Sequence, residues 1–248
     1  MFSKIRNRLS NTFKAYRFRE TSNPELNDPI ALIELAQKYY NRGVYIDAIK
    51  CYNKAIKLDP KNHRILTLRA MAKSRIHKFK ESINDLKKVV FIDPNDGFAW
   101  HGLAENYFET NELALSKESY DKAIECGVTS HNVYFMRGKI NYAFKQFKEA
   151  YDDLTTSIEK ESRLIESYVY LGLACSKLGL LEEELNNYDQ AIRLGSKNPA
   201  VYFNRGMVKL NKSEIEKAKA DFFKASEMGF KDADMVLDKW DVYVNKHK

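Results

Sequence analysis

The stretch ALIELAQKYYNRGVYIDAIKCYNKAIKLDP, from Ala31 to Pro60, reads as two short amphipathic helices joined by a tight turn. Gly43 separates the two helical patterns. Pro60 ends the second pattern, because proline lacks the amide hydrogen that a continuing helix needs. Neither helix can bury its apolar face alone. The stretch therefore predicts a helical hairpin that packs against further copies of itself.

The same pattern returns every 34 residues, with starts at residues 29, 63, 97, 131, 165 and 199. Small residues share one phase of this period: Ala36, Ala70, Ala104, Gly138, Gly172 and Gly206. Large residues share another: Tyr52, Leu86, Tyr120, Leu154, Tyr188 and Phe222. Small side chains let neighbouring helix backbones approach, and large ones fill the space that remains. The alternation predicts a packed array of hairpins.

A 34-residue period with this alternation resembles the tetratricopeptide repeat family, whose unit is a helix-turn-helix. The resemblance covers residues 29–232. It implies an all-α fold, a right-handed α-solenoid of six helix-turn-helix repeats. We expect an N-terminal segment and hinge at residues 1–28 and a C-terminal capping helix at residues 233–248. The resemblance also implies a concave groove, lined by the first helix of each repeat, that binds proteins or peptides.

Sequence signatures of enzymes are missing. The chain has no glycine-rich phosphate loop, and its histidines lie too far apart for a helical metal motif. Cys51, Cys126 and Cys175 fit neither a disulfide framework nor close metal spacing. We therefore expect no enzymatic activity, no cofactor and no metal. With no apolar run of about 20 residues and no signal-peptide layout, a cytoplasmic protein is the default expectation.

The positive charge of the chain is concentrated at its N-terminus. Residues 1–19 carry six cations and no acidic residue, so the rest of a chain of net charge +7 carries only +1. A nearly neutral repeat array argues against nucleic-acid binding, which needs clustered cations. A helix in this segment would carry an apolar stripe of Phe2, Ile5, Leu9, Phe13 and Tyr16. Three interpretations stay open: a cover for the first repeat, a helix bound peripherally to anionic membrane, or a mitochondrial targeting segment.

A second period is hidden in the first. The even repeats carry arginine in the first helix and aspartate sixteen residues later, whereas the odd repeats carry neither. The pairs are Arg69 with Asp85, Arg137 with Asp153, and Arg205 with Asp221. A guanidinium at an otherwise apolar phase needs a carboxylate, because an unpaired buried charge is costly. The covariation predicts structural ion pairs; the alternative is a row of ligand-binding arginines.

The predicted groove face holds the second, fifth, ninth and twelfth residues of each first helix, which share one helical stripe. From the third repeat on, the candidate partner-binding residues are Phe98, His101, Glu105, Phe108, Phe135, Lys139, Tyr142, Val169, Leu173, Phe203, Met207 and Leu210. Most are apolar or aromatic. They predict binding of an apolar or amphipathic peptide segment; packing between repeats is the alternative interpretation.

Family members that grip the acidic carboxyl tails of chaperones use a clamp of lysine, asparagine and arginine. The matching positions here are Ile33, Gln37, Leu68, Phe98 and Gly102, which argues against that role. The sequence favours a scaffold or adaptor with its binding face from Trp100 onward. Alternatives are a membrane-associated assembly factor anchored by residues 1–19 and a self-associating structural protein.

Overall fold

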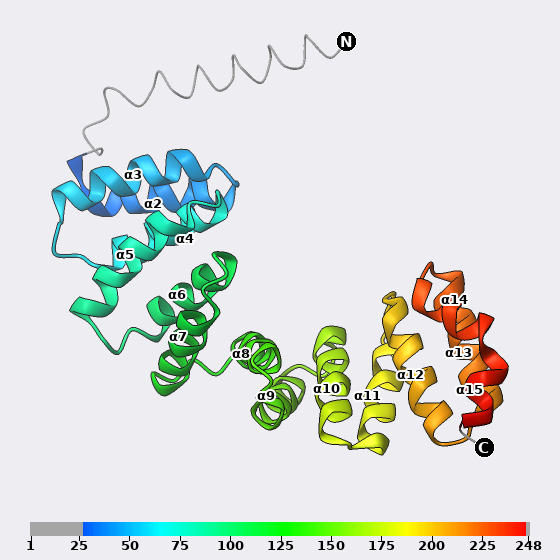
Figure 1. The fold of residues 1–248 in the computed structure, drawn as a ribbon. Coiled ribbons are helices and arrows are strands. Elements are labelled where there is room, and N and C mark those ends of the chain that lie inside the picture. Colours follow the sequence, from blue (N-terminus) through cyan, green and yellow to red (C-terminus); the bar gives the residue numbers. More distant parts are fainter. Residues whose placement is uncertain (1–26, 247–248) are drawn as a thin grey trace, which may run out of the picture. The chain divides into compact units, whose positions relative to one another are not determined.

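A computed structural model describes residues 27–246, and within that range the structure consists of helices joined by short loops. The chain divides into two compact units, residues 1–127 and 128–248, so that the division falls between the third and fourth repeats. Each unit is made of consecutive antiparallel helix pairs (Figure 1). The fold is that of a helical repeat protein, all-α, as the sequence predicted.

Unit 1 contains three helix pairs. They are α2 (Pro29–Asn41) with α3 (Tyr45–Leu58), α4 (Arg64–Arg75) with α5 (Phe79–Ile92), and α6 (Gly97–Glu109) with α7 (Leu113–Glu125). Each pair also packs against the next through α3 with α4 and α5 with α6. Asp28 starts α2, because its carboxylate accepts hydrogen bonds from the amides of Ile30 and Ala31 at 3.1 and 3.2 Å.

Unit 2 contains three further pairs and two short helices. The pairs are α8 (His131–Ala143) with α9 (Phe147–Lys160), α10 (Ile165–Leu178) with α11 (Leu181–Arg193), and α12 (Pro199–Asn211) with α13 (Ile215–Glu227). The short helices are α14 (Lys231–Asp238), which packs on α13, and α15 (Trp240–Lys246). Among residues 27–246, no helix is both long enough and apolar enough to cross a membrane.

The prediction of one capping helix at residues 233–248 is wrong in detail, since the structure has two short helices there. Helix α14 begins at Lys231 and ends at Asp238, and Lys239 separates it from α15. Trp240 then lies with its ring centroid 5.9 Å from that of Phe222, at an interplanar angle of 69°. This aromatic contact packs Trp240 against the core of the last repeat.

The turn inside every helix pair holds one residue in the left-handed conformation. These residues lie 34 positions apart: Gly43, His77, Asn111, Lys145, Gly179 and Ser213, with φ between 58° and 75°. Only Gly43 and Gly179 are glycine, so the residue type marks this turn in just two of the six helix pairs. Non-glycine residues adopt the left-handed conformation at a modest cost, which the packed helix pair sustains.

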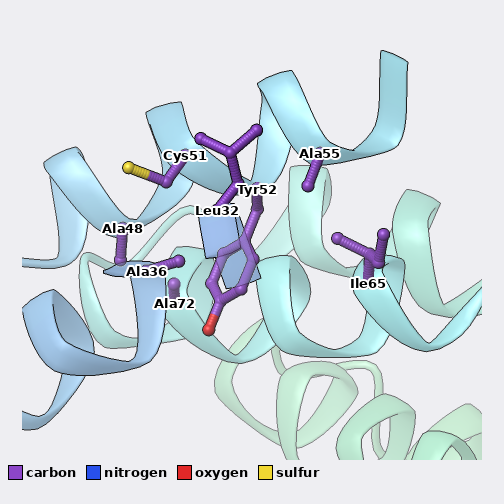
Figure 2. Packing of buried hydrophobic residues seen from close by; sticks show 8 residues of the cluster. All are labelled: Leu32, Ala36, Ala48, Cys51, Tyr52, Ala55, Ile65 and Ala72. Carbon is purple, nitrogen blue, oxygen red and sulfur yellow. The ribbon is translucent and has the colours of Figure 1, made fainter. Parts of the chain in front are cut away.

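The core is a row of large side chains set among small ones. Figure 2 shows this for Tyr52, which is 1% exposed and lies among alanines of three helices, Ala36 of α2, Ala48 and Ala55 of α3, and Ala72 of α4. Leu32, Cys51 and Ile65 complete the cluster. The small and large phases of the sequence are thus the two sides of one packing scheme, repeated along each unit.

Candidate binding surfaces and structural ion pairs

We call the predicted groove face the inner stripe. It consists of the second, fifth, ninth and twelfth residues of each repeat, counted from the starts at 29, 63, 97, 131, 165 and 199. In unit 1 it presents one strongly exposed apolar side chain from each repeat. These are Ile30, Met71 and Phe98, with exposed fractions of 66%, 48% and 76%. His101 and Phe108 of α6 are half-buried, and the Nε2 atom of His101 lies 3.6 Å from Oε1 of the exposed Glu105. The stripe of unit 1 thus presents an accessible apolar side chain in each of its three repeats.

A cation stands beside this stripe at the end of α4. The Nε of Arg75 donates a hydrogen bond to the Tyr40 hydroxyl of the preceding repeat at 3.2 Å. The Tyr40 ring is itself placed by an edge-on contact with Tyr45, at a centroid distance of 5.2 Å. The hydrogen bond to Tyr40 and, less strongly, the charge of Glu105 raise the pKa of Arg75. Tyr40 thus helps to orient an exposed guanidinium next to the apolar residues.

In unit 2 two residues predicted to face a partner lie in the core instead. Phe135 is 5% exposed and Leu210 is fully buried, so their assignment as groove residues was wrong. The Phe135 ring packs edge-on against Tyr170 of the next repeat at a centroid distance of 6.0 Å. Leu210 packs in a cluster with Phe222 and with Val236 of α14. Both side chains are covered by neighbours that the stripe alone does not reveal.

The rest of the predicted residues in unit 2 are half-buried: Lys139, Tyr142, Val169, Leu173, Phe203 and Met207. The Nζ atom of Lys139 lies 5.1 Å from the ring centroid of Phe135 and 5.3 Å from that of Tyr170. These are cation–π distances. Tyr142 also meets Tyr170, edge-on at 6.1 Å. Tyr170 is central to this aromatic cluster, yet the sequence reasoning missed it, because it lies one position outside the inner stripe.

The structure brings together all three predicted ion pairs. In each, the arginine Nε and Nη2 atoms donate to the two oxygens of one aspartate. The distances are 2.8 and 2.6 Å for Arg69 with Asp85, and 2.9 and 2.6 Å for both Arg137 with Asp153 and Arg205 with Asp221. The carboxylates are buried and the guanidinium groups mostly so. This bidentate geometry gives the arginines a structural role.

Each buried carboxylate accepts a further hydrogen bond that the sequence reasoning missed. The donors are Lys73 at 2.7 Å, Asn141 at 2.9 Å and Lys209 at 2.8 Å, each four residues after its arginine. The signal was available, because Lys, Asn and Lys recur at that position in the same even repeats. With these donors, most of the acceptor capacity of each carboxylate is used inside the fold.

Arg69 and Arg205 also reach the repeat before their own. Arg69 Nη1 donates to Asn53 at 2.7 Å, and Arg205 Nη1 donates to Asp189 at 2.6 Å. Burial lowers the pKa of Arg205, but its hydrogen bonds to Asp221 and Asp189 outweigh this and raise it. These arginines join three helices, the two of their own repeat and the second helix of the repeat before. They therefore link each of these repeats to the one before it.

The described residues provide no metal centre, since no group of three His, Cys, Asp or Glu side chains in residues 27–246 is arranged to hold an ion. Cys51 and Cys175 are buried thiols. Burial, with the charges of Glu183 and Glu184, raises the pKa of Cys175 to about 12, which makes it a weak nucleophile. The predicted membrane or cap contacts Phe2, Ile5, Leu9, Phe13 and Tyr16 lie outside the described residues.

Comparisons with known proteins agree with the geometry. A TPR repeat model matches residues 36–73, and a tetratricopeptide repeat model matches residues 99–125. This chain belongs to the tetratricopeptide repeat family. YrrB, described as a TPR protein with an unusual peptide-binding site, superposes with a TM-score of 0.68 at 20% identity, over 72% of this chain and 92% of YrrB. A MamA structure superposes with a TM-score of 0.61 at 22% identity, over 67% and 91%.

Curated relatives are larger proteins. RNA polymerase II-associated protein 3 of Xenopus tropicalis is 27% identical over 190 residues, which are 70% of this chain and 29% of that protein. The small glutamine-rich tetratricopeptide repeat-containing protein of Dictyostelium discoideum is 34% identical over 85 residues, 34% of this chain and 25% of that protein. The chain spans less than a third of each. Membership of this family indicates a protein–protein interaction scaffold, a non-enzymatic fold.

Proposed function

We propose that this tetratricopeptide repeat protein is a scaffold that binds an amphipathic segment of a protein partner along the inner stripe of unit 1. The observation that carries the proposal is the exposure of Ile30, Met71 and Phe98. They come from the first helices of three consecutive repeats, and all belong to the inner stripe. Covering such side chains removes apolar surface from water, which supplies about 25 cal/mol for each Å² buried.

Charge beside the stripe indicates what the partner segment carries. Arg75 is oriented by Tyr40, and the exposed Glu105 lies one repeat further along. A guanidinium is suited to a carboxylate, with which it forms charge-assisted hydrogen bonds. The segment that fits has apolar side chains on one face and an acidic residue opposite Arg75. A basic residue opposite Glu105 would complete the match.

This location differs from the hypothesis drawn from the sequence, which favoured the chain from Trp100 onward. That hypothesis counted aromatic residues, but Phe135 and Leu210 are used for packing. Lys139, Tyr142, Val169, Leu173, Phe203 and Met207 of unit 2 are half-buried and form a secondary candidate surface. The description of YrrB as a peptide-binding TPR protein supports a peptide ligand as a class, without indicating which peptide.

Selection from a displayed library of random 16-residue peptides on the full chain would test the proposal. Phe98→Glu and Met71→Glu should each weaken binding of the selected peptides about tenfold or more, because a charge replaces an apolar contact. Ile46→Glu is the matched control, since Ile46 is 61% exposed in unit 1 but lies at the start of α3, outside the inner stripe.

A charge reversal adds a test of partner chemistry. Selection on the Arg75→Glu variant should replace an acidic residue of the peptides by a basic one, while the apolar positions persist. Peptides that bind Phe98→Glu and Met71→Glu as tightly as the unaltered chain would show that the inner stripe of unit 1 is not the binding surface.

A further inference from the structure

Two of the three second helices in unit 1, α3 and α5, end in exposed apolar side chains, which are together named the helix-end patch. The helix-end patch consists of Leu58 at the end of α3 and Phe91 and Ile92 at the end of α5. Their exposed fractions are 46%, 88% and 57%. Phe91 is among the most exposed large apolar side chains in residues 27–246. Exposure of this extent means that core packing does not explain the choice of phenylalanine there.

The repeat register makes Phe91 more unusual. At the same position the other five repeats carry a charged residue: Lys57, Glu125, Glu159, Arg193 and Glu227. A charge at this position keeps the last turn of the second helix in water. The second repeat alone places an aromatic ring there, although nothing in the packing of helix pairs requires it. Such a departure from the pattern indicates a contact with something else.

The helix-end patch lies at the end of unit 1 where the described chain begins. Paired helices run antiparallel, so the ends of α3 and α5 are at the same end of unit 1 as the starts of α2, α4 and α6. Figure 1 shows the loops after α3 and after α5 on the side where α2 begins. The 26 residues before Asn27 are therefore joined to the chain beside the patch.

Those 26 residues have the length and the side chains to cover it. Phe2, Ile5, Leu9, Phe13 and Tyr16 would form one apolar stripe if the segment is helical, about 21 Å long at 1.5 Å per residue. Residues 17–26, when extended, span up to about 35 Å. From α2 to α5 the chain crosses three helix spacings of about 8–10 Å each. The segment can therefore reach both α3 and α5.

Charge favours the binding of residues 1–19 to the helix-end patch less than apolar contact does. Asp59 and Asp93 directly follow α3 and α5 and would attract the six cations of residues 1–19. Lys57, on the last turn of α3, and Lys88, four residues before the end of α5, oppose that attraction. What favours this occupant over a separate molecule is its attachment: tethering within a few helix widths gives it a high effective concentration at the patch.

We propose that residues 1–19 dock as an amphipathic helix on the helix-end patch of their own chain, with Phe91 as the principal contact. Phe91 and the inner stripe are separate surfaces, so the proposal is independent of the peptide-binding function above. Docking would withdraw both the basic segment and the patch from other partners, including an anionic membrane surface.

Limited trypsin digestion of the full chain tests this, because six trypsin sites lie in residues 1–19. The test variant is Phe91→Glu, which restores the type of residue found in the third, fourth and sixth repeats. Cleavage within residues 1–19, followed by mass spectrometry, should become about tenfold faster, since one large apolar contact is lost. Ile46→Glu, at the opposite end of the helix pairs, should leave the rate unchanged. Leu9→Glu should speed cleavage as Phe91→Glu does.

Three outcomes would overturn the proposal. Cleavage of the Phe91→Glu variant at the rate of the unaltered chain would show that the segment does not use this patch. A fall in molar mass by light scattering on Phe91→Glu would indicate that a second copy of the chain covers the patch. Cleavage of the unaltered chain as fast as a synthetic peptide of residues 1–20, with protection only on phosphatidylserine vesicles, would assign the segment to a membrane surface.

Discussion

The two units place different residues at the tightest point of the same repeat. Where a first helix meets its second helix, unit 1 has Ala36, Ala70 and Ala104, all fully buried, whereas unit 2 has Gly138, Gly172 and Gly206. A methyl group added to these glycines would lie 2.9, 2.6 and 2.9 Å from Leu154, Tyr188 and Phe222. In unit 2 the large side chain of the second helix therefore occupies space that an alanine fills in unit 1.

The inner stripe also differs between the units in how many of its apolar side chains are buried. In unit 1 it exposes apolar side chains such as Phe98, while in unit 2 Phe135 and Leu210 are part of the core. The comparison shows that one repeat register accommodates two ways of distributing apolar side chains, one leaving surface for a partner and one using it for packing. Substitutions at three kinds of site would test this comparison.

The largest effect is expected where the units are alike. Asp85 in unit 1 and Asp221 in unit 2 are each buried and each accept from an arginine and a lysine. Asp85→Ala and Asp221→Ala should each lower the free energy of unfolding by about 3–5 kcal/mol, because two cations lose their buried partner. Urea unfolding, followed by the fluorescence of Trp100 for unit 1 and of Trp240 for unit 2, measures this.

Each unit holds one of the two tryptophans, so Trp240→Phe and Trp100→Phe backgrounds separate the signals. Asp47→Ala is the control, since Asp47 pairs with Lys50 at 2.7 Å on the surface and such pairs contribute less than about 1 kcal/mol. Losses below that value at both buried aspartates would contradict a stabilising role for the shared ion pairs.

The next effect tests the difference between alanine and glycine. Gly172→Ala should lower the free energy of unfolding by about 2 kcal/mol, because the new methyl group overlaps the Tyr188 ring and the gain in helix propensity does not offset this. Ala70→Gly in unit 1 should cost about 1 kcal/mol through lost propensity and packing. A stabilised Gly172→Ala variant would mean that Tyr188 moves aside easily and that the two units pack alike.

The smallest effect concerns Glu184, which is buried in unit 2 where the other repeats have Ala48, Ser82, Ser116, Ala150 and Ala218. Burial raises the pKa of Glu184, although the hydroxyls of Ser176 and Tyr188 and the charge of Lys177 act in the opposite direction. Glu184→Ala should raise the free energy of unfolding by about 1 kcal/mol at pH 7, because a poorly solvated carboxylate is removed.

The pH dependence of that gain has a definite sign. A raised pKa means that the folded chain binds more protons than the unfolded one. The glutamate therefore lowers the free energy of unfolding as the pH rises above 4.5, the ordinary pKa of this group. The gain from Glu184→Ala should therefore be small at pH 4 and larger at pH 7, by urea unfolding with Trp240 as the probe. Glu159→Ala, at an exposed site of unit 2, should show no such change. A gain that is equal at both pH values would point to a packing effect.

Sequence reasoning predicted features that repeat and missed features that depend on one neighbour. The period revealed the helix pairs, and the covariation of arginine with aspartate revealed Arg69 with Asp85 and its two counterparts. It missed Lys73 and Lys209, although they recur four residues after the arginines of the same even repeats, because lysine is usual on exposed helix surfaces. It also placed Phe135 on the surface, because the stripe of one helix does not include Tyr170 of the next.

The sequence by itself determined that the chain is a series of helix pairs, since a 34-residue period with fixed small and large phases is compatible with little else. It also determined the partners inside each even repeat, because a buried charge requires its opposite. Only the tertiary structure decided which apolar residues remain exposed. Phe98 and Phe135 both belong to the inner stripe, and one is 76% exposed and the other 5%. The cause is burial by a neighbouring repeat, a property that no single helix encodes.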